Sequence, residues 1–166
     1  TKLLPDEWRG ARVLSSPLRR CVETASTLGS GAIATDERLA EMAWGEWEGS
    51  RLSDRRASLG RPMRANEALG LDFMPPGGES PRQVFQRVSG LLAEVGAGGI
   101  PLLAITHRGV IRAIFAHATG WGMRGKAPFK LDWNALQVFE VTADGGLSIH
   151  SLNVELPSRK AGTAIS

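Results

Sequence analysis

The chain has 166 residues, of which 22% are charged, with a formal net charge of +3 and a single cysteine, Cys21. This length suits one domain with a core of its own, and one cysteine excludes both an intramolecular disulfide and a cysteine-based metal cluster. No apolar run approaches the roughly 18 residues of a membrane span, so we expect a soluble, cytoplasmic protein with no membrane partner. Arginine dominates the basic residues and suits phosphate-bearing partners. However, the excess of positive charge is small and spread along the chain, as on an ordinary protein surface. Nucleic acid is therefore not an expected partner.

The first part of the chain predicts a strand followed by a helix. The strand covers residues 11–16, and Ser16-Pro17 then predicts a helix with the serine as N-cap and the proline at the first helical position. Arg19 and Arg20 fall in the first turn of this helix. Because cations oppose the helix dipole there, a functional role for them requires a nearby anion.

A second strand is expected within residues 32–39, followed over residues 39–49 by a loop in which acidic residues and tryptophans alternate. Residues 50–75 then form a partly helical excursion over the predicted active site. A solvated face or the selection of an anionic substrate explains its arginines equally well. These are Arg51, Arg55, Arg56, Arg61 and Arg64.

The second half of the chain contains the clearest helix and two further strand patterns. Ser80-Pro81 repeats the helix-start signal, and an apolar stripe follows it up to the glycines at 96–99. A buried strand from Ile100 ends at Thr106-His107 and leads directly into a packed helix.

The C-terminal part of the chain predicts a hairpin. Strand patterns over residues 135–141 and 147–154 flank Asp144-Gly-Gly, which favours a tight turn and one antiparallel strand in an otherwise parallel sheet. Residues 157–166 are expected to fray. The order of elements predicts a single α/β domain over residues 1–166.

Several polar residues stand at predicted strand ends or helix starts, namely Ser16, Arg20, Glu41, Glu79 and His107. Because ligands gather at the carboxyl ends of parallel strands, these side chains can converge on one site. An arginine and an imidazole suit a phosphate group, and a carboxylate can move a proton to or from a leaving oxygen. Each also has a purely structural alternative, such as a surface cation or a loop acid. The three histidines are far apart in sequence, so we predict neither a metal nor another cofactor.

Four segments resemble, in order, the motifs of the histidine phosphatase superfamily, the phosphoglycerate-mutase-like phosphatases. They are Ser15–Ala25 (SSPLRRCVETA), Leu39–Gly49 (LAEMAWGEWEG), Pro76–Ser80 (PGGES) and Thr106–Ala113 (THRGVIRA). The resemblance covers nearly the whole chain. It implies a three-layer α/β/α sandwich whose sheet is mostly parallel with one antiparallel strand.

The resemblance also implies a mechanism. In such enzymes a histidine of an Arg-His-Gly motif, at the end of the first strand, attacks the phosphoryl group and becomes phosphohistidine, and no metal takes part. By resemblance, Arg20 binds the phosphate, His107 stabilises the transferring group and Glu41 is the acid/base residue. The further predicted substrate-binding residues, with the Glu79-Ser80 pair at the rim of the pocket, are Ser16, Glu79, Ser80, Arg108 and Gly109.

One element of the family pattern is absent from these 166 residues, because they contain no Arg-His-Gly triplet. His117 and His150 stand outside any such motif. In the family the first strand lies inside the sheet, so we expect an N-terminal segment of the natural protein to supply that strand and the nucleophile. Less favoured alternatives are a strand from another chain and a noncatalytic relative.

The expected function is therefore that of a metal-independent phosphatase that hydrolyses a small phosphorylated metabolite through a phosphohistidine intermediate. Phosphoglycerate-mutase-like phosphotransfer and a noncatalytic phosphate-binding pseudoenzyme are the alternatives. The sequence indicates neither the identity of the substrate nor an oligomeric state.

Overall fold

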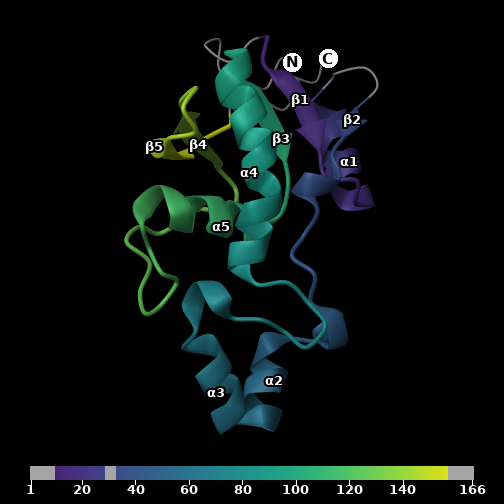
Figure 1. Ribbon diagram of the computed structural model, residues 1–166. Helices are drawn as coiled ribbons and strands as arrows, with labels where there is room; N and C mark the ends of the chain where they lie inside the picture. Colours follow the sequence, from purple (N-terminus) through teal and green to yellow (C-terminus); the bar gives the residue numbers. More distant parts are fainter. Residues whose placement is uncertain (1–9, 29–32, 157–166) are drawn as a thin grey trace, which may run out of the picture.

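The structure is a computed structural model that describes residues 10–28 and 33–156 (Figure 1). Three parallel strands form one sheet in the order β2-β1-β3, and an antiparallel pair forms a second sheet. The parallel strands are β1 (Arg12–Ser15), β2 (Ala34–Thr35) and β3 (Leu102–Ile105), and the pair is β4 (Leu136–Val141) with β5 (Leu147–Val154). The predicted α/β class is confirmed.

Five α-helices accompany these strands within the described ranges. They are α1 (Arg19–Thr27), α2 (Leu52–Leu59), α3 (Arg61–Glu67), α4 (Pro81–Gly98) and α5 (Arg108–Thr119). The central helix α4 packs against α5 and β4, while α2 and α3 project from the body of the molecule at the bottom of Figure 1. None of the helices in the described part of the chain is both long and apolar enough to cross a membrane.

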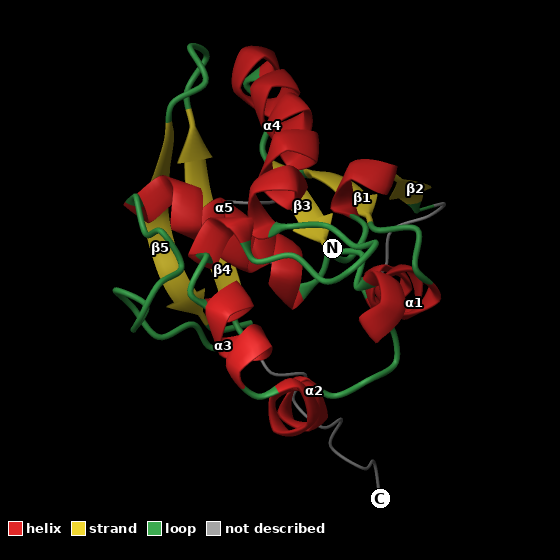
Figure 2. Cartoon of the chain, turned by 60° about the horizontal axis from the view of Figure 1, so that its bottom comes forward, coloured by secondary structure: helices red, strands yellow, loops and turns green. Residues whose placement is uncertain are grey.

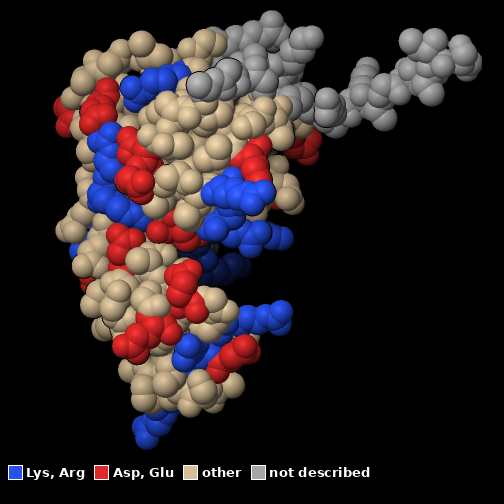
Figure 3. Space-filling view, turned by 90° about the vertical axis from the view of Figure 1, so that its right-hand side faces the viewer, with Lys and Arg blue, Asp and Glu red and all other residues tan. Residues whose placement is uncertain are grey.

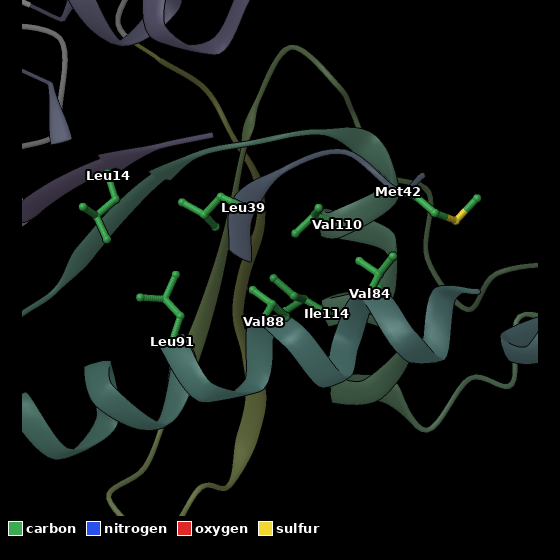
Figure 4. Close-up of a cluster of buried hydrophobic side chains, with 9 residues drawn as sticks. Leu14, Leu39, Met42, Val84, Val88, Leu91, Val110 and Ile114 are labelled. Carbon is green, nitrogen blue, oxygen red and sulfur yellow. The ribbon is translucent and has the colours of Figure 1, made fainter. Parts of the chain in front are cut away.

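The core lies between α4, α5 and the end of the parallel sheet (Figure 4). The apolar stripe predicted for α4 is confirmed, since Val84, Val88 and Leu91 are buried. A capping box starts this helix: the Ser80 side chain accepts from the backbone N–H of Gln83, and the Gln83 side chain accepts from the backbone N–H of Ser80. The cluster consists of Leu14, Leu39, Met42, Val84, Val88, Leu91, Val110, Ala113 and Ile114.

The start of α1 differs from the prediction. The helix begins at Arg19 with Leu18 as its N-cap, and the Oγ atom of Ser16 accepts a hydrogen bond from the N–H of Leu18 at 3.3 Å, before the helix starts. The prediction that Ser16 is the N-cap was therefore wrong. The side chain of Ser16 is turned instead toward the end of the neighbouring strand, where it contacts His107.

The strand predicted within residues 32–39 is shorter than expected. Only Ala34–Thr35 pairs with β1, and a 3-10 turn over Glu37–Leu39 follows. Asp36 causes this change of direction, because its carboxylate accepts from the backbone N–H of Arg38 and caps the turn. The frayed tail predicted for residues 157–166 lies outside the described residues.

The predicted hairpin forms, but within the described ranges β4 pairs only with β5, and β3 pairs only with β1. In Figures 1 and 2 the hairpin lies on one side of α4, while β1 and β2 lie on the other. Each of β3 and β4 therefore has one long edge without a strand partner in this part of the chain. Such an edge presents backbone N–H and C=O groups that can pair with a further strand.

Residues 39–49 are held against residues 76–78 by close backbone contact. The N–H of Glu46 donates to the carbonyl of Pro76 at 2.9 Å, and a Cβ atom on Gly45 would overlap that same carbonyl oxygen. Gly45 also has a positive φ of 52°, which favours glycine. The loop that carries Glu41 is thus fixed by a glycine four residues later.

Candidate active site

Residues far apart in sequence meet where β1 and β3 end. Ser15 is level with Ile105 in the parallel register, and the N–H of Ser16 donates to the carbonyl of Ile105 at 2.8 Å. Because the two strands end together, the residues that follow them, Ser16 and His107, lie side by side. α1 and α5 start beside this edge of the sheet.

His107 is the N-cap residue of α5, as its place between a strand and a helix predicts, and it is only 6% exposed. Its Nδ1 atom lies 2.9 Å from Nη2 of Arg20, and its Nε2 atom lies 2.8 Å from Oγ of Ser16. A guanidinium group only donates hydrogen bonds, so Nδ1 is the acceptor. The neutral ring therefore carries its proton on Nε2 and donates it to Ser16.

Burial lowers the pKa of His107 to about 4, and the positive charges of Arg20 and Arg87 act in the same direction. The ring is therefore uncharged at neutral pH. A bound phosphate dianion would favour the protonated ring, because an opposite charge at short range stabilises the imidazolium.

Glu41 lies against the start of α5. Its Oε1 atom accepts from the backbone N–H of Met42 at 2.9 Å, and its Oε2 atom lies 3.9 Å from Nδ1 of His107. A Cβ atom on Gly109 would overlap Oε1 of Glu41, so the glycine makes room for the carboxylate. A carboxylate and an imidazole thus stand together beside one guanidinium group.

Arg20 and Glu41 line a cavity of about 260 Å³. On the side of the molecule that carries α1, the surface has a hollow just above the projecting α2 and α3. Side chains of both charges border this hollow (Figure 3). The wall comes largely from the loop of acids and tryptophans. The lining residues are Arg20, Glu41, Trp44, Trp47, Glu48, Gly49, Ser50 and Leu52.

The arginines of the 50–75 excursion do not line this cavity as far as the described residues go. Arg55 donates to the side chain of Ser50 and to the carbonyl of Glu46, and Arg56 pairs with Glu67. The acidic residue Glu48 forms part of the wall instead. The selection of an anionic substrate by these arginines gains no support from their positions.

Five residues predicted to bind substrate also lie outside the described lining of the cavity: Ser16, Glu79, Ser80, Arg108 and Gly109. Ser16 supports His107, Gly109 accommodates Glu41, and Ser80 caps α4. The guanidinium group of Arg108 lies 5.2 Å from the ring centre of Trp133 in a cation–π contact. As substrate-binding residues, all five stay predictions.

Two residues near the site were not recognised from the sequence. The Sγ atom of Cys21 lies 3.4 Å from Nε2 of His107, and Arg87 binds the loop that carries Glu41. Burial raises the pKa of the Cys21 thiol, with Glu41 contributing, against the lowering effects of Arg20 and Ser16. The thiol is therefore protonated at neutral pH and poorly suited to act as a nucleophile.

Potential metal ligands do not gather here: across residues 10–28 and 33–156 no three side chains of histidine, cysteine, aspartate or glutamate converge as a metal site would require.

Comparison with known proteins assigns the family. A sequence model of the histidine phosphatase superfamily (branch 1) matches residues 2–155. A bifunctional protein of Mycobacterium tuberculosis is 30% identical over 151 residues, which is 86% of this chain. The chain spans only 40% of the length of that relative.

Solved structures share the fold. The mycobacterial glucosyl-3-phosphoglycerate phosphatase in complex with inorganic phosphate has a TM-score of 0.70 and 23% identity, over 90% of this chain and 79% of its own. YhfR of Bacillus stearothermophilus has a TM-score of 0.72 and 23% identity, over 87% of this chain and 74% of its own. At this level of identity the likeness demonstrates the fold alone. Together with the match over residues 2–155, it means that the chain belongs to the histidine phosphatase superfamily, branch 1.

Proposed function

We propose that the complete protein is a metal-independent phosphatase that hydrolyses a small phosphorylated molecule through a phosphohistidine intermediate. The observation that carries this proposal is the convergence of Arg20, Glu41 and His107 where β1 and β3 end, with Nδ1 of His107 2.9 Å from Arg20 and 3.9 Å from Glu41. The family and the named phosphatase among its structural neighbours support phosphatase-type chemistry and leave the substrate open.

Each of the three residues has a role that suits its chemistry. Arg20 binds the phosphate through charge-assisted hydrogen bonds, and His107 stabilises the charge on the transferring group. Glu41 donates a proton to the leaving alcohol as the P–O bond breaks and a P–N bond to the nucleophile forms. In the second step water attacks phosphorus, its proton passes to Glu41, and the P–N bond breaks to release phosphate.

The nucleophile in this proposal comes from outside the 166 residues. His117 lies in the last turn of α5 and stacks on Phe85, with ring centres 3.8 Å apart, and His150 lies within β5. The unpartnered edge of β3 offers the position for a further parallel strand. Because β3 ends two residues before His107, a histidine at the end of a parallel neighbour would face His107.

The test is the activity of the full-length product of the gene. We expect release of phosphate from p-nitrophenyl phosphate and from glycerol 2-phosphate in the presence of EDTA. Rapid quenching should trap a phosphoenzyme that is stable in base and labile in acid. Phosphate binding without turnover would favour the noncatalytic alternative, and transfer to a second alcohol in preference to water would favour the mutase alternative.

Replacement of Gly109 by alanine is expected to lower kcat for glycerol 2-phosphate about tenfold, because small displacements of a reacting group are costly in rate. The added Cβ would displace the carboxylate of Glu41 and press on Cβ of Met42, which would lie 3.3 Å away. The unfavourable contacts of the added Cβ oppose the higher helix propensity of alanine, which is about 1 kcal/mol. The thermal midpoint should therefore change little. Gly98→Ala in α4 is the matched control, because nothing lies within 4 Å of its added Cβ. Equal activity of both variants would contradict the placement of Glu41.

A further inference from the structure

Arg87 of α4 holds the loop that carries Glu41 by its backbone. Its Nη1 atom donates to the carbonyl of Arg38 at 2.7 Å, and its Nη2 atom donates to the carbonyls of Ala40 at 2.7 Å and Glu41 at 3.2 Å. Only 22% of the arginine side chain is exposed. Three carbonyl groups of a four-residue stretch thus converge on one rigid, planar guanidinium group, which fixes their relative positions.

Glu79 holds the same loop just beyond Glu41. Its Oε2 atom accepts from the N–H of Ala43 at 3.0 Å, and its own N–H donates to the carbonyl of Ala43 at 2.8 Å. Its Oε1 atom accepts from Nε of Arg87 at 2.9 Å. The ion pair between Glu79 and Arg87 therefore binds the backbone on both sides of Glu41.

Glu79 is itself unsuited to protonate a leaving group. Burial raises its pKa, but hydrogen bonds from Arg87 and from the N–H of Ala43 outweigh burial and leave the pKa below its ordinary value. Glu79 is therefore a carboxylate at neutral pH, and both of its oxygens already accept hydrogen bonds. Glu41 and Glu48 both line the cavity, and Glu41 is the one whose carboxyl group lies beside His107, with Oε2 3.9 Å from Nδ1.

We propose that Glu79 and Arg87 are positioning residues for Glu41: their ion pair fixes the loop so that the Glu41 carboxyl group meets the leaving oxygen beside His107. This inference rests on the proposed phosphatase function and gives Glu79 a role other than contact with substrate. It also explains why α4, which does not line the cavity in the described structure, carries an arginine directed at three backbone carbonyls.

A general-acid defect can be separated from simple destabilisation by the leaving group. The p-nitrophenolate ion departs without protonation, whereas the alkoxide of glycerol 2-phosphate must be protonated as it leaves. Misplacement of Glu41 should therefore slow the first step, phosphoryl transfer to the enzyme, more for the alkyl ester than for the aryl ester. A loss of folded protein would slow both reactions equally.

The experiment compares kcat/KM for the two esters in the full-length protein and its variants, because both esters form the same phosphoenzyme and kcat/KM reports the step in which the ester bond breaks. In Glu79→Gln, the amide N–H₂ group faces either the N–H of Ala43 or Nε of Arg87, so one of these two hydrogen bonds is lost. Arg87→Lys keeps the positive charge, but the lysine side chain cannot bind all three carbonyl groups. Each variant should lower the ratio of alkyl to aryl kcat/KM about tenfold. Asp72→Asn and Arg82→Lys are matched controls, because this ion pair also joins α4 to the preceding chain, with Nε and Oδ1 2.6 Å apart.

The expected result is a lowered ratio in Glu79→Gln and Arg87→Lys and an unchanged ratio in the two controls. An unchanged ratio in the first two variants, with an active parent protein, overturns the positioning role and leaves the phosphatase function intact. A parent protein that hydrolyses neither ester overturns the proposed function and the inference with it. Thermal midpoints of all four variants identify any equal loss of both activities as a folding effect.

Discussion

Replacement of Arg20 by glutamine is expected to lower kcat/KM for phosphomonoester hydrolysis by the full-length protein about a thousandfold, since loss of one preorganised donor at a developing charge has effects of that order. Glutamine is shorter and uncharged, so the phosphate loses a charge-assisted, two-pronged contact at the start of α1. The measurement is steady-state kinetics on both esters. The deficit should be similar for each, because phosphate binding does not depend on the leaving group.

Arg19 provides the matched control for this prediction. It precedes Arg20 in the same helical turn, but its side chain is 91% exposed and pairs with Glu23 in solvent. Arg19→Gln should therefore leave kcat/KM within about twofold, as expected for a surface ion pair of small energy. Comparable losses in the two variants would mean that general basicity of α1, rather than one guanidinium group, binds the phosphate.

Arg20→Gln should also change the titration of His107. The guanidinium group lies 2.9 Å from Nδ1 and is one of the positive charges that, after burial, lower the pKa of this ring. Its removal should raise the pKa of His107, which NMR of the imidazole carbon-bound protons can follow. An unchanged titration midpoint of His107 would mean that the charge of Arg20 does not affect this ring.

The elements that the sequence predicts well are those whose signals are local. Ser80-Pro81 marks the start of α4, and Asp144-Gly-Gly marks the turn between β4 and β5. His107 is likewise found from its immediate neighbours, an apolar strand before it and a packed helix after it. These features need no knowledge of the rest of the chain.

The features that the sequence does not predict depend on partners far away in the chain. Arg87 meets carbonyl groups 46 to 49 residues earlier, and no pattern around an arginine reports which backbone oxygens it will bind. Cys21 fits its helix as an ordinary apolar residue, and only the convergence of β1 and β3 brings it to His107. Ser16 has the N-cap signature, yet a long-range contact to Nε2 of His107 competes for its hydroxyl group, and the helix starts later.

The separation of the two sheets is likewise not predictable from local sequence, because strand pairing also depends on distant partners. Strand patterns identify β3 and β4 but not their partners, and in the described residues β3 pairs with β1 while β4 pairs with β5. The site is therefore predictable as a set of side chains at strand ends, whereas the contacts that hold its loop are not.

The free energy of unfolding is expected to rise by up to about 3 kcal/mol between pH 4 and pH 6.5 on account of His107 alone, at 1.36 kcal/mol for each pKa unit. Burial, assisted by Arg20 and Arg87, lowers the pKa of the folded ring to about 4 from its ordinary value of 6.5. Between these values the unfolded state binds the proton and the folded state does not. Stability therefore increases with pH across this window and is lost as the pH falls.

Urea unfolding of the protein and of its His107→Gln variant, at steps from pH 4 to pH 7.5, measures this contribution as the difference between two curves. Carboxylates with lowered pKa values, among them Asp36 and Glu79, change stability in the same direction, chiefly toward the acid end of this range and below it, and they are common to both proteins. The difference should be constant above pH 6.5 and shrink as the pH falls from 6.5 to 4. A constant difference, or an imidazole that titrates near 6.5 by NMR, would mean that His107 is solvated and charged at mildly acidic pH. In that event the neutral ring that accepts from Arg20 and donates to Ser16 would be the main form that receives phosphate only above about pH 6.5.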